Sequence, residues 1–302
     1  MPASDLPPDL AEAVGSADTL RALLDALPRP DDAEVAARAQ RLAVPPTDAD
    51  RRRRLVEVAI SVTDLTTLAA DDTPARVRAL AAMARRPDPD DPETPTVAAV
   101  CVYPDLVAIA ARELAGSGVR AASVAGAFPS SRSPLAVKVA EVQAAVAAGA
   151  DEIDVVLDRG ALLDDREHEA LTQLEALVAA AGGAHVKVIL ETGALPDAAT
   201  ILRAAWVALL AGADVVKTST GKDGPGASPA AVLLLLEAAA AFGERTGRRT
   251  GVKASGGVRD TEQALGYLAL VAEVGGEDWL HPDRFRFGAS GLLAALVAER
   301  RR

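Results

Sequence analysis

Residues 213–222 read ADVVKTSTGK, and the organisation of the chain can be worked out from this stretch. Its apolar residues up to Lys217 predict a short buried strand, and the Thr/Ser/Gly residues that follow predict a loop that carries Lys222. A single lysine at the end of a strand most often emerges into solvent. If it stays buried, desolvation disfavours its charged form, lowers its pKa and makes the amine nucleophilic at neutral pH.

The composition favours a chemical use for this lysine. Of 32 basic residues only five are lysine, and the other 27 are arginine. Arginine cannot form an imine and is effectively never deprotonated, so the few lysines are expected where a primary amine matters. The lysines are Lys138, Lys187, Lys217, Lys222 and Lys253.

A second motif, GVKASGGVRD at residues 251–260, repeats the pattern about one strand–helix unit later. It places Lys253 near a strand end, followed by glycines that lead into a helix. If the two strands are neighbours, they lie about 4.8 Å apart. Each lysine then disfavours protonation of the other, which is one way to activate an imine-forming amine.

Strand and helix signals alternate from residue 60 to the end of the chain, which predicts a (β/α)8 TIM barrel. An open, doubly wound sheet is the alternative, but no GxGxxG motif follows a first strand. The predicted strands are 60–65, 96–103, 120–125, 152–157, 185–191, 214–217, 251–254 and 286–288, and the predicted helices are 74–85, 105–115, 134–148, 167–181, 197–211, 229–242, 261–274 and 291–300.

Residues 1–58 are predicted to form an N-terminal helical extension, with helices at 17–27, 32–42 and 50–59, and residues 59–302 the barrel domain. The polar, proline-rich segment 85–96 is predicted to be a solvated loop on the amino-terminal rim of the barrel.

Composition limits the possible partners. A formal charge of −11 argues against nucleic-acid or anionic-membrane binding. We expect no signal peptide and no membrane span, because no basic segment precedes an apolar run and no apolar run is long enough. One cysteine, Cys101, suits a reducing cytoplasm and is expected to be a small buried strand residue. The three histidines show no metal-ligand spacing.

Polar groups and glycines gather where the predicted strands end, which is where a barrel carries its chemistry. Asp64 follows an apolar run, and Asp154 lies within EIDVVL, where a buried carboxylate needs a partner such as a lysine. Lys187, on the fifth predicted strand, is placed beside the same cavity. Backbone N–H groups and a helix N-terminus are expected to bind a phosphate at Gly221, Lys222, Gly256, Gly257, Gly288 and Ser290.

These motifs carry a family resemblance. VCVYP at 100–104, EIDVV at 152–156, ETGAL at 191–195, VKTSTGK at 216–222, GVKASGGVRD and FGAS at 287–290 resemble those of deoxyribose-phosphate aldolases. VTDLTTLAADDT at 62–73 and WLHPDRFRFGAS at 279–290 are also similar to that family. The resemblance extends from about residue 55 to about residue 297.

The resemblance implies a metal-independent class I aldolase that cleaves 2-deoxy-D-ribose 5-phosphate into acetaldehyde and D-glyceraldehyde 3-phosphate. By motif, Lys217 is the Schiff-base lysine, and Lys253 lowers its pKa. Asp154, Lys253 and an ordered water are implied to transfer protons. Asp64, Cys101, Lys187 and Thr220 are predicted to contact substrate. The family also implies a homo-oligomer, a dimer or tetramer, and no cofactor.

Three alternatives remain open at this level. Ala254, Ser255 and Gly226 depart from the usual family motifs and leave room for a related Schiff-base aldolase with another aldehyde. A non-catalytic phosphosugar-binding barrel would need the glycines but not the lysine pair. An isomerase would need a strand-end carboxylate such as Glu191. The chain ends in Glu299-Arg-Arg-Arg302 and lacks the terminal tyrosine of some family members.

Overall fold

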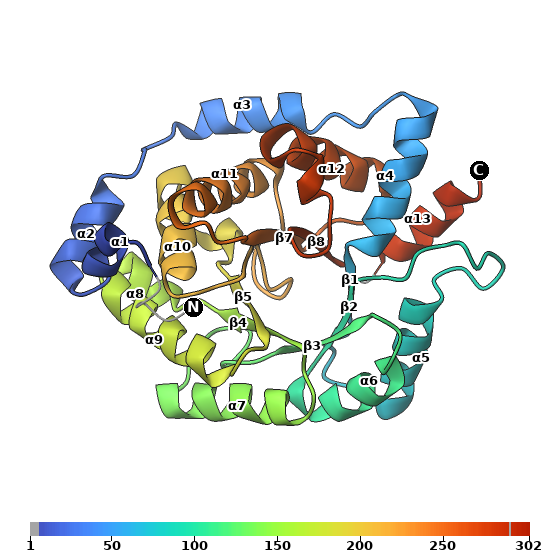
Figure 1. Ribbon diagram of the computed structural model, residues 1–302, viewed down its shortest axis with the longest axis horizontal. Coiled ribbons are helices and arrows are strands. Elements are labelled where there is room, and N and C mark those ends of the chain that lie inside the picture. The colour runs from blue at the N-terminus through green and yellow to red at the C-terminus, as the bar shows by residue number, and fades with distance from the viewer. Residues whose placement is uncertain (1–5, 290) are drawn as a thin grey trace.

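A computed structural model describes residues 6–289 and 291–302. Its strands form a closed parallel barrel in sequence order, and helices connect them on the outside (Figure 1). This confirms the predicted (β/α)8 class. The strands are β1 (Thr63–Thr66), β2 (Ala99–Val102), β3 (Arg120–Val124), β4 (Glu152–Val156), β5 (His185–Ile189), β6 (Val215–Lys217), β7 (Gly251–Ser255) and β8 (Phe285–Ala289).

The outer helices cover the barrel with Ala-, Val- and Leu-rich faces, as a chain with 3% aromatic residues requires. Ser228 and Pro229 show how one of them starts: the Ser228 hydroxyl caps the helix, and proline stands at its first turn. Gly247, in the left-handed region, ends it. These helices are α5 (Pro74–Arg85), α6 (Val107–Leu114), α7 (Leu135–Ala147), α8 (Arg159–Leu163), α9 (Glu167–Ala180), α10 (Ala198–Leu210), α11 (Pro229–Thr246), α12 (Thr261–Gly275) and α13 (Leu292–Arg300).

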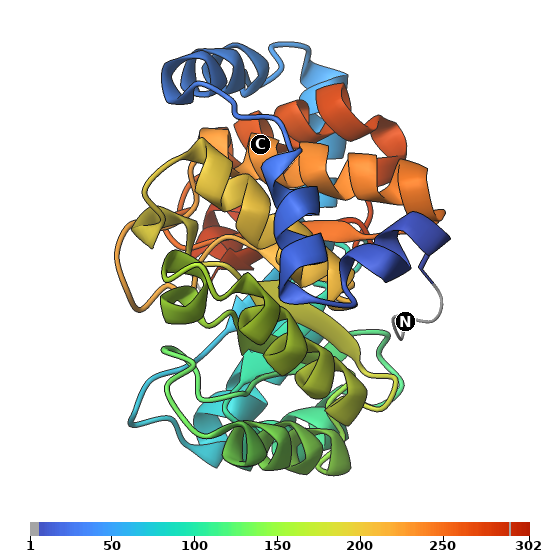
Figure 2. The ribbon, with the colours of Figure 1, turned by 90° about the vertical axis from the view of Figure 1, so that its left-hand side faces the viewer.

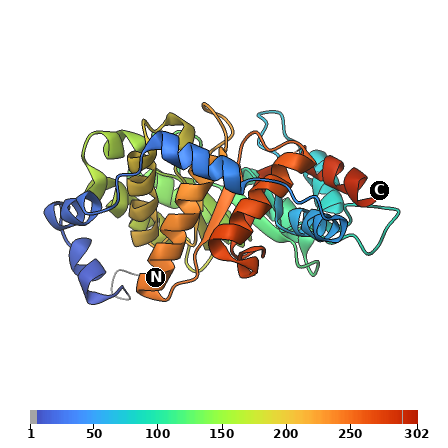
Figure 3. The same cartoon turned by 90° about the horizontal axis from the view of Figure 1, so that it is seen from above.

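The N-terminal segment wraps around one side of the barrel. Its helices are α1 (Pro8–Ala13), α2 (Ala17–Asp25), α3 (Asp32–Leu42) and α4 (Ala49–Ser61), of which α1 was not predicted. Helix α2 packs against α9 (Figure 2), and α3 crosses α11 and α12 (Figure 3). Helix α4, which packs against α12 and α13, crosses the predicted boundary between residues 58 and 59, so the division into extension and barrel stays a prediction.

The start of the first strand was predicted too early. Ile60 and Ser61 belong to α4, and β1 begins at Thr63. The apolar residues Leu55, Val56, Ala59 and Ile60 recur at helical spacing and are all buried. The run therefore buries one face of a helix that packs onto the barrel, and only the residues after it enter the sheet.

The proline-rich loop after α5 is less solvated than predicted. Asp88 is 1% exposed and accepts hydrogen bonds from Arg301, with the Arg301 Nε–Asp88 Oδ2 distance at 2.7 Å. Arg300 pairs with Asp91. The acidic residues of the loop thus meet the basic end of α13 and attach the loop to the barrel.

Across the parts of the chain that the structure describes, no helix is both long and apolar enough to span a bilayer.

Candidate active site

A pocket of about 530 Å³ opens at the carboxyl end of the barrel, where the loops after β1, β6, β7 and β8 meet. Lys217, the last residue of β6, reaches its floor. The pocket is lined by most of the residues predicted for substrate and phosphate binding: Thr220, Gly221, Lys222, Gly256, Gly257 and Gly288. Ser290 lies outside the described residues.

Lys217 and Lys253 lie side by side, as the two motifs predict. They are register partners on the neighbouring strands β6 and β7. Both amines donate to one carboxylate oxygen, Asp154 Oδ2 on β4, from 2.7 Å for Lys217 Nζ and 3.0 Å for Lys253 Nζ. The other oxygen, Asp154 Oδ1, accepts from Lys187 Nζ at 2.8 Å. Asp154 therefore joins three lysines, all of them buried.

The two neighbouring lysines have opposite electrostatic environments. Burial lowers the pKa of Lys217, and the charge of Lys253 lowers it further, while Asp154 opposes both effects. Burial also disfavours the charged form of Lys253, but Asp154 and Asp64 together raise its pKa above the usual value. The sequence predicted that each lysine would lower the pKa of the other. The structure differs because Lys253 has a second carboxylate partner.

That second carboxylate belongs to a deeper layer of charge inside the barrel. Asp64 Oδ2 accepts from Lys253 Nζ at 2.5 Å, and Asp64 Oδ1 accepts from Arg286 at 2.5 Å. Glu152 accepts from Arg286 Nη2 at 2.8 Å and pairs with Lys187 at 2.5 Å. Burial raises the carboxyl pKa values, but the surrounding cations outweigh it and lower those of Asp64, Glu152 and Asp154.

This layer predicts how stability depends on pH. Because folding lowers the pKa of Asp154, its stabilising contribution is present above the unfolded value of about 3.9 and is lost as pH falls below it. We expect Asp154→Asn to lower the free energy of unfolding by about 3–5 kcal/mol at pH 7, because three amines lose their shared partner. Urea unfolding should show this difference narrowing below about pH 4. A difference that stays constant down to pH 3 would contradict the assignment.

The other substrate contacts predicted from the sequence lie below the pocket. Asp64, Lys187 and Cys101 are fully buried and do not line it. Burial and the charge of Asp154 raise the pKa of the Cys101 thiol to about 11, so the thiol is neutral at physiological pH. Substrate contact by these three residues stays a prediction.

Glu191 has a structural task. It adopts a left-handed backbone conformation, with φ of 55° and ψ of 56°, two residues after the end of β5. Its Oε2 accepts from the Thr220 backbone N at 3.1 Å and from the Thr220 hydroxyl at 2.5 Å. These bonds hold the pocket-lining Thr220, and they engage the carboxylate that an isomerase would need as a free base.

Ser255, one of the departures from the family motif, connects two walls of the pocket. Its hydroxyl donates to the Ser219 carbonyl at 2.6 Å, and its backbone N donates to the Thr218 hydroxyl at 3.0 Å. Gly226, another departure, leaves room for the neighbouring loop, because a Cβ there would lie 2.2 Å from the Gly256 carbonyl oxygen. Both substitutions are compatible with close contact between the loops after β6 and β7.

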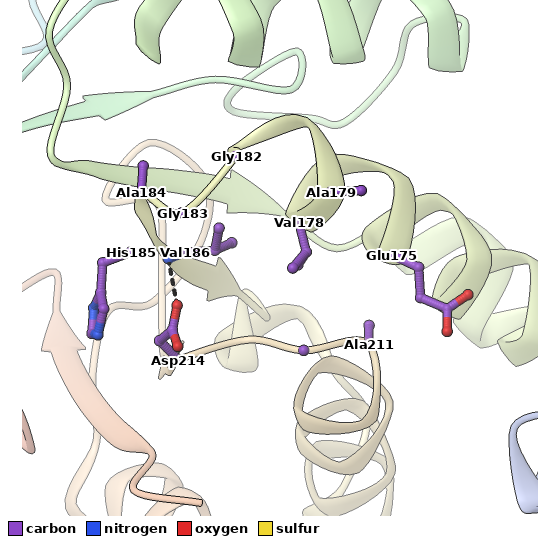
Figure 4. Close-up of a pocket in the computed structure, with 11 residues that line it drawn as sticks. Glu175, Val178, Ala179, Gly182, Gly183, Ala184, His185, Val186, Ala211 and Asp214 are labelled. Carbon is purple, nitrogen blue, oxygen red and sulfur yellow. Dashed lines mark hydrogen bonds between the residues drawn. The ribbon is translucent and has the colours of Figure 1, made fainter. Parts of the chain in front are cut away.

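A second cavity, of about 540 Å³, lies at the amino-terminal end of β5 (Figure 4). Its polar groups include Glu175, His185 and Asp214, and the Asp214 carboxylate accepts from the Val186 backbone N at 2.9 Å. Asp154 and the three lysines bonded to it, Lys187, Lys217 and Lys253, do not line this cavity. Active sites of (β/α)8 barrels lie at the carboxyl ends of the strands, so the pocket at Lys217 is the candidate site.

Together, the closed barrel, the lysine–carboxylate cluster at its carboxyl end and the glycine-lined pocket define a (β/α)8-barrel enzyme with amine groups at the centre of its site. The model of the DeoC/LacD family aldolases matches residues 58–295. The chain belongs to this family, as the resemblance implied.

Named relatives and solved structures agree with this assignment. The chain is 38% identical over 246 residues to human deoxyribose-phosphate aldolase, covering 78% of this chain and 77% of the human one. It is 39% identical over 247 residues to the mouse deoxyribose-phosphate aldolase, with the same coverage. A tetrameric deoxyribose phosphate aldolase from Aeropyrum pernix is 27% identical, has a TM-score of 0.64, and the match covers 90% of this chain and 99% of that one.

Proposed function

We propose that this chain is a class I aldolase that reversibly cleaves 2-deoxy-D-ribose 5-phosphate into D-glyceraldehyde 3-phosphate and acetaldehyde through an imine on Lys217. The observation that carries the proposal is the buried Lys217 amine, whose pKa is lowered, hydrogen-bonded to Asp154 on the floor of a pocket rimmed by glycines and Lys222. The human and mouse relatives, by their names, act on this substrate.

The charge balance of the cluster supports Lys217 as the nucleophile. Among the described residues, the enclosed cluster contains three carboxylates, Asp64, Glu152 and Asp154, and the three cations Lys187, Lys253 and Arg286 besides Lys217. The cluster is neutral only if Lys217 is uncharged. A net charge on a buried cluster is strongly destabilising. Loss of the Lys217 proton makes the cluster neutral, so the uncharged form of this amine is favoured.

The first half of the reaction starts at the aldehyde carbon, C1, of the open-chain sugar. The lone pair of Lys217 Nζ attacks C1 to give a carbinolamine, and loss of water leaves a protonated imine. The imine withdraws electrons, so the C2–C3 bond can break as the C3 hydroxyl gives up its proton. C3 leaves as the aldehyde of D-glyceraldehyde 3-phosphate, and the C2 fragment stays on Lys217 as an enamine.

Asp154 and Lys253 transfer the protons of this sequence in our proposal. Asp154 Oδ2 accepts hydrogen bonds from both Lys217 Nζ and Lys253 Nζ, so this carboxylate links Lys253 to the reacting amine. Protonation of the enamine at C2 gives the two-carbon imine, and water then releases acetaldehyde and the free Lys217 amine. A positioned acid–base pair of this kind typically contributes about 10²–10⁴-fold to rate.

The substrate phosphate is proposed to bind in the glycine-rich half of the pocket. Gly221, Lys222, Gly256, Gly257 and Gly288 line this region, and Ser290 is retained as a predicted contact. Gly221, Gly256 and Gly257 have positive φ values, which glycine adopts without strain. Loops of this kind present backbone N–H groups to an anion, and Lys222 adds a positive charge.

Lys222→Met tests the phosphate site. We expect kcat/KM for deoxyribose 5-phosphate to fall about 10–100-fold, because a charge-assisted hydrogen bond is worth about 1.5–3 kcal/mol. Cleavage of unphosphorylated 2-deoxyribose should not change. Steady-state kinetics with both sugars makes the comparison, and an equal loss with both would place Lys222 outside phosphate binding.

Borohydride trapping with peptide mass mapping tests the proposed function directly. Incubation with acetaldehyde or deoxyribose 5-phosphate, followed by reduction, should leave a two-carbon adduct on Lys217. If folded protein binds the sugar phosphate and gives no adduct on any lysine, the aldolase mechanism is wrong and a phosphosugar-binding barrel becomes the better reading.

We also propose that the enzyme is a cytoplasmic homo-oligomer that works without metal. The single cysteine suits a reducing compartment, and the related Aeropyrum pernix aldolase is described as tetrameric. Size-exclusion chromatography with light scattering tests the assembly, and activity after chelation tests the metal requirement.

A further inference from the structure

Glu152 and Arg286 are buried charged groups that no step of the proposed reaction uses. They lie next to Asp154 and Lys253 in the barrel: Glu152 is two residues before Asp154 on β4, and Arg286 on β8 is the register partner of Lys253 on the neighbouring strand β7. Both are at most 1% exposed, and neither lines the pocket at Lys217. Neither residue can touch a substrate there.

This pair replaces the apolar packing that usually fills a barrel core. Burying two charges is expensive even when they are paired, and apolar residues of similar volume often stabilise a protein as well or better. Arg286 is also connected to the reacting groups: its guanidinium donates to Asp64, which accepts from Lys253, which in turn donates to Asp154 beside Lys217. Removing one charge from this series of hydrogen-bonded groups changes the net charge that surrounds the Lys217 amine.

We propose that Glu152 and Arg286 are positioning residues that set the number of charges beneath the pocket, so that Lys217 is held uncharged while Lys253 stays charged. The inference rests on the proposed imine role of Lys217. Arg286 supplies the third cation that balances the three buried carboxylates. Without it, Lys217 is the remaining group able to supply that charge, by taking up a proton.

Charged and titratable groups face Lys217 from several strands. Asp154 on β4, Lys253 on β7 and Cys101 on β2 are its immediate electrostatic neighbours. Lys187 on β5 and Asp64 on β1 form the next layer. Arg120 on β3 is the outermost charged group of the series. It donates to Glu152 at 2.9 Å and to the half-exposed Asp283 at 2.7 Å. Arg120 has its own outer partner, so it does not replace Arg286.

The test follows the pH dependence of Lys217 reactivity in Arg286→Gln. The rate of reductive trapping of acetaldehyde on Lys217 is expected to rise with pH as the amine loses its proton, and this rising part of the pH–rate profile is the limb to compare. In Arg286→Gln the limb should move by about one pH unit or more to higher pH, so that trapping at pH 7 falls about 10-fold. Arg286→Lys retains the positive charge and should keep the limb of the unmodified protein. A folded Arg286→Gln variant with an unmoved limb would overturn the proposal.

The double variant Glu152→Gln with Arg286→Gln separates charge balance from a merely structural role. It removes one charge of each sign, so the limb should return to that of the unmodified protein, and the melting temperature should exceed that of Arg286→Gln alone. If Arg286→Gln does not fold, this double variant carries the test. A double variant with a displaced limb, or one less stable than the single variant, contradicts charge balance.

A separate measurement keeps this inference distinct from the aldolase proposal. Labelling of Lys217 by an amine-selective reagent such as trinitrobenzenesulfonate needs no imine and reports the same pH dependence. If labelling shows the displaced limb but acetaldehyde gives no adduct on the unmodified protein, the charge-setting role stands and the aldolase function fails. If the adduct forms and Arg286→Gln changes neither limb, the aldolase function stands and the inference fails.

Discussion

Lys217→Ala is expected to lower kcat/KM for cleavage of deoxyribose 5-phosphate by about 10⁴-fold or more, the scale of loss when the nucleophile of a covalent enzyme is removed. Lys253 cannot take over, although it lies on the neighbouring strand. Its Nζ donates to both Asp64 and Asp154, and these carboxylates raise its pKa. The production of D-glyceraldehyde 3-phosphate, followed with a coupled dehydrogenase assay, measures the loss.

The controls for this prediction separate chemistry from folding. Asp154 keeps Lys187 and Lys253 as partners when Lys217 is truncated, so the variant should fold and should still be stabilised thermally by D-glyceraldehyde 3-phosphate. Lys217→Arg should be equally inactive, because a guanidinium does not form the imine. Substantial activity in either variant, or an adduct on Lys253, would assign the nucleophile to another residue.

The barrel and the lysine pair were predictable because each depends on local sequence pattern. Strand and helix signals alternate along the chain, and parallel neighbours bring equivalent positions together. Lys217 and Lys253 each precede a glycine-containing loop at a strand end, so neighbouring strands were enough to place them side by side. The glycines around the pocket followed from the same argument.

The deeper charge layer was not predicted, although part of its signal was present. Glu152 and Asp154 are two residues apart on one strand and so point to the same face, which made Glu152 a candidate as soon as Asp154 was one. Arg286 gave no such signal, because an arginine within FRFGAS is more often at a surface. Its inward position depends on contacts with Asp64 and Glu152, which are more than 130 residues away.

The opposite pKa shifts of Lys217 and Lys253 could not be predicted from the sequence either, because they also depend on contacts between residues far apart in the chain. Proximity of two amines predicts mutual lowering, and only the number of carboxylates around each amine decides which one keeps its proton. Lys253 has Asp64 in addition to Asp154, whereas Lys217 has Asp154 alone among the described carboxylates. Asp64 is 189 residues from Lys253 in the chain.

Lys253→Met is expected to lower turnover at pH 7 by about 10²–10⁴-fold, for two reasons that a second variant can separate. The first is charge: with Lys253 gone, three buried carboxylates face the two cations Lys187 and Arg286, so Lys217 takes up a proton and stops being a nucleophile. The second is the loss of a group that donates and accepts protons beside Asp154. Trapping on Lys217 at pH 7 should fall together with turnover, and both should recover in part at alkaline pH.

Lys253→Arg keeps the charge but removes the proton transfer, because a guanidinium stays protonated. Lys217 should then remain uncharged and trap acetaldehyde at a rate within a few-fold of the unmodified protein, while turnover stays as low as in Lys253→Met. Measuring trapping and turnover on both variants therefore assigns each role. If the arginine variant turns over normally, Lys253 acts through its charge alone. If it neither traps nor turns over, the shape of the amine between Asp64 and Asp154, rather than its charge, controls Lys217.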